Sequence, residues 1–534
     1  MLIFFNPPAQ SASYPASRAM PRLTPSQILA LALFGMFAGV TVLWLSLDRS
    51  PPNWDDAWYL ANSLSVYDAL TQRGVLGFLS SLYSAFGFKA PLIAALPTPF
   101  YLLLGRHWHA AFLVNIAAMF ILFAALYRIA VRLWSARAAV LAITITGTMP
   151  LLYGLVRWYM VDYLLAALVA LAMCLLWEGN PLDRPRHALL FGALCGVGLL
   201  LKAAFALFLL PAFVYAWWGS RRRPQALLHF ATPGLILALP WYILHGPATL
   251  RNALSAGYGL SATVQGTGPI FSWHSITTYL SRLAVGGVST YYAAVGAGLL
   301  ILAICRRKTL PAIPPELLLW ALPFLVFLFG GNKDLRYVAP ILPLFALLLS
   351  CLLDWALPLS RVGSAIAVLL VAYPVVQMSA VSFGLPYRVD SIVYARPFQR
   401  NIWPLDQVLR NIAASAPRQS EDRPFLLVGA DRGSLNANNI ELTAVALQLP
   451  FRVETTAHTR SLAAALERLE HADFFLYEDG GEPESPVFNP YISDLVRQVR
   501  SGERFVELPF ATFLPDGGVI RVFRRSSDER RFTE

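Results

Sequence analysis

Residues 25–63 read PSQILALALFGMFAGVTVLWLSLDRSPPNWDDAWYLANS, and two features of this stretch decide the fold. An apolar run over residues 25–47 comes first, and the adjacent carboxylates Asp55 and Asp56 follow shortly after it. A helix that crosses a membrane needs about 20 mostly apolar residues. The run is therefore predicted to span a membrane, and the two acids are predicted to lie at its surface.

The composition extends this interpretation to the whole chain. Of its 534 residues, 57% are hydrophobic and 14% are charged, whereas a soluble globular protein carries about 25% charged residues. The chain is therefore predicted to be a polytopic α-helical membrane protein. The net charge of +11 comes from arginines that fall in short clusters between apolar runs. That pattern is typical of topology determinants, so nucleic acid is not expected as a partner.

About eleven spans are predicted when the same length criterion is applied along the chain. They lie near residues 25–47, 108–134, 137–156, 161–178, 188–202, 203–219, 226–245, 285–305, 315–330, 337–355 and 361–383. Together they form a predicted transmembrane domain over residues 25–383.

Basic clusters occupy the loops on one side of successive spans. They are Arg18 and Arg22, Arg128–Arg137, Arg184 and Arg186, Arg221–Arg223, Arg306–Lys308, and Arg361. The positive-inside rule places these loops in the cytoplasm, with residues 1–24 as a short cytoplasmic tail. The loop 246–284 and everything after residue 383 are then predicted to face the periplasm or exterior of an inner (plasma) membrane.

Residues 384–534 differ in composition from the rest. FLLVGA (425–430), FRVETT (451–456) and DFFLYED (473–479) have the pattern of buried strands, and helical patterns separate them. This alternation predicts an extracytoplasmic α/β domain with a parallel sheet. Its turn GADRGS lacks the glycine pattern and the lysine of a phosphate loop. For this domain, a structural or acceptor-docking role is therefore favoured over nucleotide binding.

The first outer loop, residues 48–107, is too structured in pattern to be a simple connection. YLANSLSVYDALTQRG has amphipathic helical spacing, and KAPLIAALPTPFYLLLG is apolar but interrupted by proline and too short to span. Both segments are predicted to be helices in the membrane interface. The aromatic residues around them suit a belt at headgroup level, and anchoring the bundle would by itself explain that belt.

Charged residues are predicted to gather on the same outer face. Asp162 lies about one turn inside a helix entrance, where a carboxylate is costly unless it faces a cavity or a partner; capping of the helix is the alternative. Lys202 interrupts two apolar runs, and Lys89, Lys333 and Arg336 add positive charge. Single lysines at helix ends often only anchor. Together these residues predict a pocket for a phosphate-bearing amphiphile beside an acid or base.

The order of these motifs resembles that of the GT-C glycosyltransferases, in the bacterial branch with protein O-mannosyltransferase-like enzymes and the lipid A aminoarabinose transferase. The resemblance covers roughly residues 25–355 and rests on DDAWYLANS at Asp55 and Asp56, KAPL at Lys89, the pair Arg157 and Asp162, LLKAAFALFLLP at Lys202, and RYVAPILP at Arg336 and Tyr337. The chain departs from the family pattern by Asp in place of Glu at 56, Ala90 in place of proline and Ala203 in place of glycine.

The resemblance implies a hexosyl- or pentosyltransferase that moves a sugar from a polyprenyl-phosphate donor to a lipid, glycan or protein acceptor. Such a reaction needs a base for the acceptor and positive charge for the departing phosphate. We expect Asp55 to be the base, Asp56 to support it or to bind a divalent cation, and Asp162 to position the acceptor or the metal. The donor phosphate is assigned to Lys89, Lys202 and Arg336, with Arg157, Tyr337 and Lys333 beside them.

Metal use and two other functions stay open. Mg²⁺ or Mn²⁺ held by Asp55 and Asp162 is one expectation, because hard cations prefer oxygen ligands. A transporter or flippase of lipid-linked substrates would carry its charges near the middle of the membrane. A noncatalytic scaffold for envelope assembly would not require acids at helix entrances. The glycosyltransferase is the favoured interpretation.

Overall fold

The structure is a computed structural model that describes residues 23–219, 224–306, 311–358, 360–385, 394–416, 423–480, 487–502 and 504–526. The chain forms two compact units. The bundle unit comprises Met1–Leu45, Tyr83–Ile93 and Phe112–Pro397, and the sheet unit comprises Ser46–Leu82, Ala94–Ala111 and Phe398–Glu534. The predicted N-terminal tail, apart from residues 23 and 24, and the arginine cluster at 221–223 lie outside the described residues.

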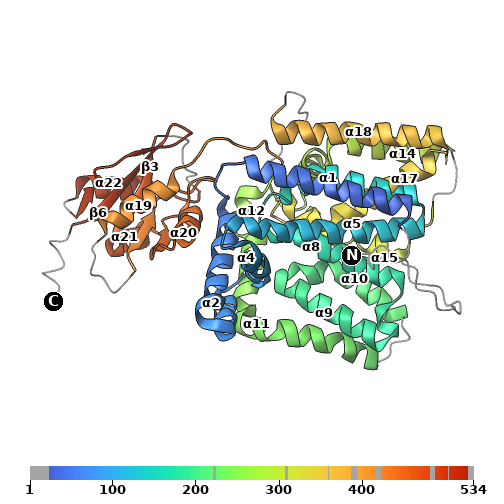
Figure 1. Ribbon diagram of the computed structural model, residues 1–534, viewed down its shortest axis with the longest axis horizontal. Coiled ribbons are helices and arrows are strands. Elements are labelled where there is room, and N and C mark those ends of the chain that lie inside the picture. Colours follow the sequence, from blue (N-terminus) through green and yellow to red (C-terminus); the bar gives the residue numbers. More distant parts are fainter. Residues whose placement is uncertain are drawn as a thin grey trace. The chain divides into compact units, whose positions relative to one another are not determined.

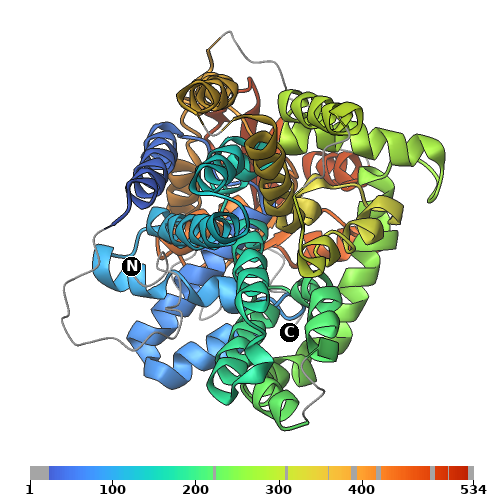
Figure 2. The same ribbon diagram turned by 90° about the vertical axis from the view of Figure 1, so that its right-hand side faces the viewer.

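The bundle unit is helical throughout its described length, and several of its helices run side by side (Figures 1 and 2). Its elements, including segments shared at its borders, are α1 (Pro25–Leu47), α3 (Leu92–Ala95), η2 (Trp108–Phe112), α5 (Leu113–Leu133), α6 (Ala136–Thr148), α7 (Pro150–Leu155), α8 (Val161–Glu178), η3 (Pro181–Asp183), α9 (Pro185–Leu201), α10 (Ala204–Gly219), α11 (Pro224–Tyr258), α12 (Leu260–Gln265), α13 (Trp273–Arg282), η4 (Leu283–Val288), α14 (Thr290–Arg306), α15 (Pro315–Leu319), α16 (Phe324–Phe329), η5 (Leu335–Ile341), α17 (Leu342–Ala356) and α18 (Arg361–Phe383).

Six helices of the described chain are long and apolar enough to span a membrane, and a seventh candidate is the pair Trp273–Val288 and Thr290–Arg306, bent by 107°. Each of the eleven predicted spans overlaps helix, but those over 137–156, 285–305 and 315–330 are each divided between two helices, and some others correspond to shorter apolar helices such as α9 and α10. The prediction of a polytopic helical membrane protein is confirmed. The number of spans stays a prediction.

The structure differs from the sequence-based expectation in these divided spans and in one predicted loop. The span predicted over 137–156 is broken between α6 and α7, because Pro150 starts a new helix and cannot donate a backbone hydrogen bond to the preceding turn. The loop predicted over 246–284 contains the end of α11, α12 and α13. Three internal prolines do not interrupt α11, which is consistent with the tolerance of apolar bundle helices for proline.

Small residues set the closest helix packing in the bundle unit. Gly192 and Gly196 lie one turn apart on α9 and face α11 at Gly234. A Cβ atom at Gly192 would lie 1.9 Å from the carbonyl oxygen of Phe230. This is the close backbone approach that glycines four residues apart permit between membrane helices, where van der Waals contact replaces hydrophobic burial.

The sheet unit contains a six-stranded sheet and helices on both faces. Its elements are α2 (Trp54–Ser84), α4 (Thr98–Leu104), α19 (Leu405–Ser415), β1 (Phe425–Val428), α20 (Ala437–Ala446), β2 (Arg452–Thr455), α21 (Leu462–His471), β3 (Phe474–Asp479), α22 (Ile492–Ser501), β4 (Phe505–Glu507), β5 (Thr512–Phe513) and β6 (Val519–Arg525). The strand order is β2-β1-β3-β6-β4, with β5 paired to β6.

The three predicted strands are present and pair in parallel, as predicted, and three further strands that were not predicted extend the sheet by antiparallel pairing. β1 pairs in parallel with β2 and β3, whereas β6 runs antiparallel to β3, β4 and β5. The turn between β5 and β6 contains Asp516, Gly517 and Gly518, with Gly517 at φ 90°, a conformation that glycine adopts without strain. This hairpin extends the parallel core by antiparallel strands.

Alternate residues of the central strands face two separate apolar cores. On one face Leu426 and Leu476 pack with Leu409 and Ile412 of α19 and Ile440 of α20. On the other face Leu427 and Phe475 pack with residues of α21 and α22, namely Leu469, Leu495 and Val499. The result is a three-layer α/β/α arrangement, which Figure 1 shows around β3 and β6.

The first outer loop is helical, as predicted. α2 bends at Gly74, whose φ of 68° lies in the left-handed region. Beyond the bend Leu76 is 82% exposed, and on α4 Leu103 is 80% exposed. Exposed leucines on short amphipathic helices suit an interfacial location, which stays a prediction because the structure contains no membrane.

Candidate active site

The loop between α7 and α8 is held in place by two buried side chains. Asn115 of α5 donates from Nδ2 to the carbonyl oxygens of Val156 (3.0 Å) and Trp158 (2.8 Å). The hydroxyl of Tyr159 donates to the carbonyl oxygen of Ile93 at 2.7 Å. These bonds satisfy backbone groups that would otherwise be buried without partners, and they fix the entrance of α8.

Asp162 lies in the first turn of α8 and its side chain is almost fully buried. Lys202 is the residue at which α9 ends, with extended φ and ψ, and α10 begins two residues later. Its Nζ lies 2.6 Å from Asp162 Oδ1. The predicted acid and the predicted phosphate ligand are therefore an ion pair, and each supplies the partner that a charge in an apolar bundle requires.

A second ion pair lies at the start of η5. Asp334 accepts from the backbone N–H of Arg336 (3.1 Å), and its Oδ2 lies 2.8 Å from Arg336 Nε. The hydroxyl of Tyr394 donates to Asp334 Oδ1 at 2.8 Å, and its ring contacts Trp158 edge to face. The carboxylate thus caps η5 and ties together segments that are far apart in the sequence.

The ring of Tyr337 joins the two pairs. The Nζ of Lys202 lies 4.9 Å from its centroid, and the guanidinium carbon of Arg336 lies 5.4 Å from it. Cations near an aromatic ring are attracted by its quadrupole. We call Asp162, Lys202, Asp334, Arg336 and Tyr337 the charge cluster. Four of its five members were predicted as site residues.

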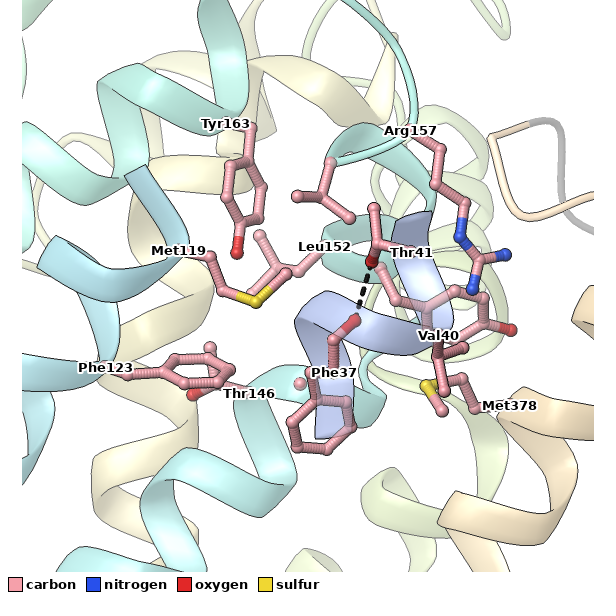
Figure 3. A pocket seen from close by; sticks show the side chains of 13 residues that line it. Phe37, Val40, Thr41, Met119, Phe123, Thr146, Leu152, Arg157, Tyr163 and Met378 are labelled. Carbon is pink, nitrogen blue, oxygen red and sulfur yellow. Dashed lines mark hydrogen bonds between the residues drawn. The ribbon is translucent and has the colours of Figure 1, made fainter. Parts of the chain in front are cut away.

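Arg157 lies apart from these contacts, buried and close to aromatic rings. Its Nη2 donates to Ser382 Oγ of α18 at 2.8 Å, and its guanidinium lies 5.2 Å from the rings of both Trp44 and Tyr153. It lines a small cavity among α1, α5, α6, α7, α8 and α18 (Figure 3). Figure 3 shows Arg157 and the Tyr163 hydroxyl on opposite sides of this cavity.

The other predicted cations have different surroundings. The Nζ of Lys333 donates to the carbonyl oxygens of Leu328 (2.6 Å) and Phe327 (3.3 Å) at the end of α16, where a cation stabilises the exposed carbonyls. Lys89 is half-buried, and the neighbouring Phe88 carbonyl accepts from Thr249 of α11 at 3.0 Å. A donor-binding role for either lysine stays a prediction.

Asp55 and Asp56 occupy the first turn of α2 in the sheet unit. Acids are favourable there because the helix dipole and free backbone N–H groups attract negative charge. Asp56 is buried, whereas Asp55 is partly exposed. Adjacent residues on a helix point about 100° apart, so the continuous helix supports different roles for the two carboxylates.

The two acids predicted to hold a metal ion, Asp55 and Asp162, lie in different surroundings. No group of three or more His, Cys, Asp or Glu side chains among the described residues is arranged to hold one. Asp162 faces an ammonium group, and Asp55 belongs to the other compact unit. The expected Mg²⁺ or Mn²⁺ ion stays a prediction.

Sequence reasoning missed Asp334, Tyr394 and Asn115 as parts of the site. Asp334 adjoins Lys333 in GNKDLR, and its N-cap position before a short turn could have identified it. Tyr394 and Asn115 lie in segments without a charge pattern. Only the tertiary fold brings them to the loop before α8.

Comparison with known proteins confirms the predicted resemblance. Residues 88–244 match the family described as dolichyl-phosphate-mannose-protein mannosyltransferase. Similar proteins are the undecaprenyl phosphate-alpha-4-amino-4-deoxy-L-arabinose arabinosyl transferases of Erwinia tasmaniensis, 31% identical over 126 residues, and of Edwardsiella ictaluri, 29% identical over 115 residues. These matches cover 22% and 20% of this chain and only 23% and 21% of the relatives.

Solved structures show the fold over most of the chain. ArnT from Cupriavidus metallidurans, bound to undecaprenyl phosphate, has a TM-score of 0.56 at 15% identity, over 92% of this chain and 98% of that one. The oligosaccharyltransferase AglB from Archaeoglobus fulgidus, in complex with an inhibitory peptide and a dolichol-phosphate, has a TM-score of 0.51 at 12% identity, over 84% and 69%. The chain has the GT-C fold of these membrane proteins.

Proposed function

We propose that the protein is an integral membrane glycosyltransferase that moves a sugar from a polyprenyl-phosphate donor to a lipid, glycan or protein acceptor outside the cytoplasm. The family match over residues 88–244 carries this proposal, because it includes Lys89, Arg157, Asp162 and Lys202. The solved relatives bound to undecaprenyl phosphate and dolichol-phosphate support a lipid phosphate as the donor class. The names of the sequence relatives favour a transferase over a transporter or a scaffold.

The charge cluster supports the handling of the donor phosphate. When the sugar leaves, the lipid phosphate gathers negative charge, and preorganised cations stabilise such charge most in a site with little water. Lys202 and Arg336 flank one tyrosine ring, and each is paired with a carboxylate. The two carboxylates hold the cations in place beside the ring.

Asp55 is proposed as the base that takes the proton of the attacking acceptor group. Its negative charge is favourable at the start of a helix, and its partial exposure suits contact with an acceptor. The buried Asp56 is proposed to support the local structure. The inner membrane location and the outward orientation rest on the alternating arginine clusters.

The test combines cells and purified protein. Mass spectra of lipids and glycans from cells with and without the gene identify the modified acceptor, and the protein in detergent is then given that acceptor and labelled polyprenyl-phosphate sugars. We expect transfer of the sugar with release of the lipid phosphate. Movement of lipid-linked sugar across liposome membranes without any transfer would replace the enzyme by the transporter.

A further inference from the structure

The topology of the sheet unit defines one edge at which ligands bind in related architectures. β1 is followed by α20 and β2 on one side, whereas β3 lies on the other side of β1. The strand order therefore reverses between β1 and β3. In open parallel sheets, ligands bind in the crevice beyond the carboxyl ends of the strands at this point. Here the loop Gly429–Asn436, which follows β1, lies at that edge.

This edge contacts a segment of the same chain. Asn439 Nδ2 donates to the carbonyl oxygen of Pro52 at 2.7 Å, and Asn438 Nδ2 donates to that of Trp54 at 2.9 Å. In return, the indole Nε1 of Trp54 donates to Asp431 Oδ1 at 2.9 Å. A Cβ atom at Gly433 would lie 2.8 Å from Asn53 Oδ1. Residues 52–54, directly before Asp55, thus lie where a ligand would be expected.

The C-terminal end of α20 is also held by the predicted outer loop, residues 48–107, which includes residues 52–54. Arg106 forms a two-pronged ion pair with Asp68 of α2, both distances being 2.6 Å. Its guanidinium also donates to the carbonyl oxygens of Val445 (2.8 Å) and Ala446 (3.1 Å), which end α20. The outer loop therefore contacts both ends of this one helix, so the position of α20 and that of the start of α2 depend on each other.

We propose that the sheet unit positions the acidic pair for catalysis, with Asn438, Asn439 and Asp431 as positioning residues that fix the backbone of residues 52–54. This inference rests on the proposed function, because it gives Asp55 its role as base. A misplacement of about 1 Å can cost a hundredfold in rate, so two side-chain amides that set the start of α2 can control turnover without touching substrate.

Asn439→Asp tests the proposal with little change of shape. The variant keeps Oδ1 as the acceptor for the backbone N–H of Asn436 (2.6 Å), but it places an oxygen against the carbonyl oxygen of Pro52. Asn489→Asp is the matched control, since this buried amide donates to Gly429 (2.7 Å) at the same edge. Amide hydrogen exchange is measured over residues 52–60 of the full chain, together with kcat and donor KM.

We expect Asn439→Asp to raise exchange over residues 52–60 and to lower kcat by about tenfold or more, with donor KM almost unchanged. Asn489→Asp should leave both readouts near wild type. A disulfide between Asn53→Cys and Gly433→Cys, added to Asn439→Asp, should restore protection and kcat when oxidised. Unchanged exchange, or raised exchange with unchanged kcat, overturns the proposal. If the wild type transfers no sugar, the proposed function fails, while the exchange data still decide whether these amides hold the loop.

Discussion

Lys202 and Asp162 form an ion pair 2.6 Å long at the junction of α8, α9 and α10. Together with Arg336 and Asp334, they make a cluster whose formal charges cancel. An incoming lipid phosphate must therefore compete with, or share, the cations that two carboxylates already hold. The second negative charge that the lipid phosphate gains when the sugar leaves would weaken the contacts of these cations with the two carboxylates.

Removal of either partner of this pair should destabilise the protein more than removal of both. Lys202→Met leaves Asp162 buried without its cation, and we expect a loss of about 2 kcal/mol, less than for a fully buried pair because the Lys202 side chain is 25% exposed. Asp162→Asn, Lys202→Met and the double variant are compared by thermal unfolding in detergent. The double variant should recover part of the loss.

Donor binding gives the second measurement on the same variants. Lys202→Met should weaken binding of the polyprenyl-phosphate donor, because a cation aimed at the phosphate is lost. Arg137→Met serves as the control, since Arg137 pairs with Asp354 (2.7 Å) elsewhere in the bundle. Equal donor affinity in both variants would remove Lys202 from the phosphate site.

Asp55→Asn should lower turnover by roughly a hundredfold or more, in line with the contribution of a general base. Binding of the donor should change little, because its phosphate is assigned to the cations. Transfer rate and donor affinity are measured beside Asp56→Asn, whose buried side chain should affect stability first. Full activity in Asp55→Asn would shift the assignment of the base to Asp56 or Asp162.

Glu441 on α20 should make the sheet unit sensitive to pH. Burial raises its pKa to about 7, whereas an unfolded chain has a value of about 4.3. The folded state therefore holds more protons between these values, and the free energy of unfolding falls as the pH rises from about 4.3 to 7. Glu441→Gln removes this effect and should stabilise the unit at pH 8.

Amide exchange of α20 in the full chain checks this effect of Glu441. We expect slower exchange in Glu441→Gln than in the wild type at pH 8, and no difference near pH 4, after correction for intrinsic rates. Glu467→Gln on α21 alters an exposed carboxylate and is the control. A benefit of Glu441→Gln that is the same at both pH values would contradict the titration.

A reporter that is active only in the cytoplasm should stay silent when fused to the C-terminus. The arginine clusters place the end of the chain outside, and a fusion after residue 306 should be active by the same rule. An active C-terminal fusion would show that the number of spans differs by one. The orientation proposed for the acceptor side would then be reversed.

The sequence predicted helices better than their connections. The apolar run at 25–47 became α1 with the same bounds, because length and hydrophobicity alone decide such a segment. The strands β4, β5 and β6 were missed, since they are short or carry charged residues such as Arg521 and Arg524 on positions that the sheet leaves partly exposed. β6 pairs with β3, which lies about 40 residues earlier, and β4 and β5 pair with β6.

For the candidate site, motif order identified Asp162, Lys202, Arg336 and Tyr337 but not their mutual contacts. A sequence pattern places charges on one side of a membrane and does not pair them. The salt bridge from Lys202 to Asp162 joins residues 40 positions apart, and the bond from Tyr394 to Asp334 joins residues 60 apart. Residues this far apart in the sequence are brought together by helix packing, which the local periodicity of a sequence does not predict.

The sheet unit is built from three separated stretches, Ser46–Leu82, Ala94–Ala111 and Phe398–Glu534. In evolution, such a unit cannot be gained, lost or exchanged as one cassette at the end of a gene. If the C-terminal stretch were replaced by that of a relative, the side chains at positions 438 and 439 would change, while the segment 52–54 that they contact would stay as it is. These two parts of the gene are therefore expected to change together.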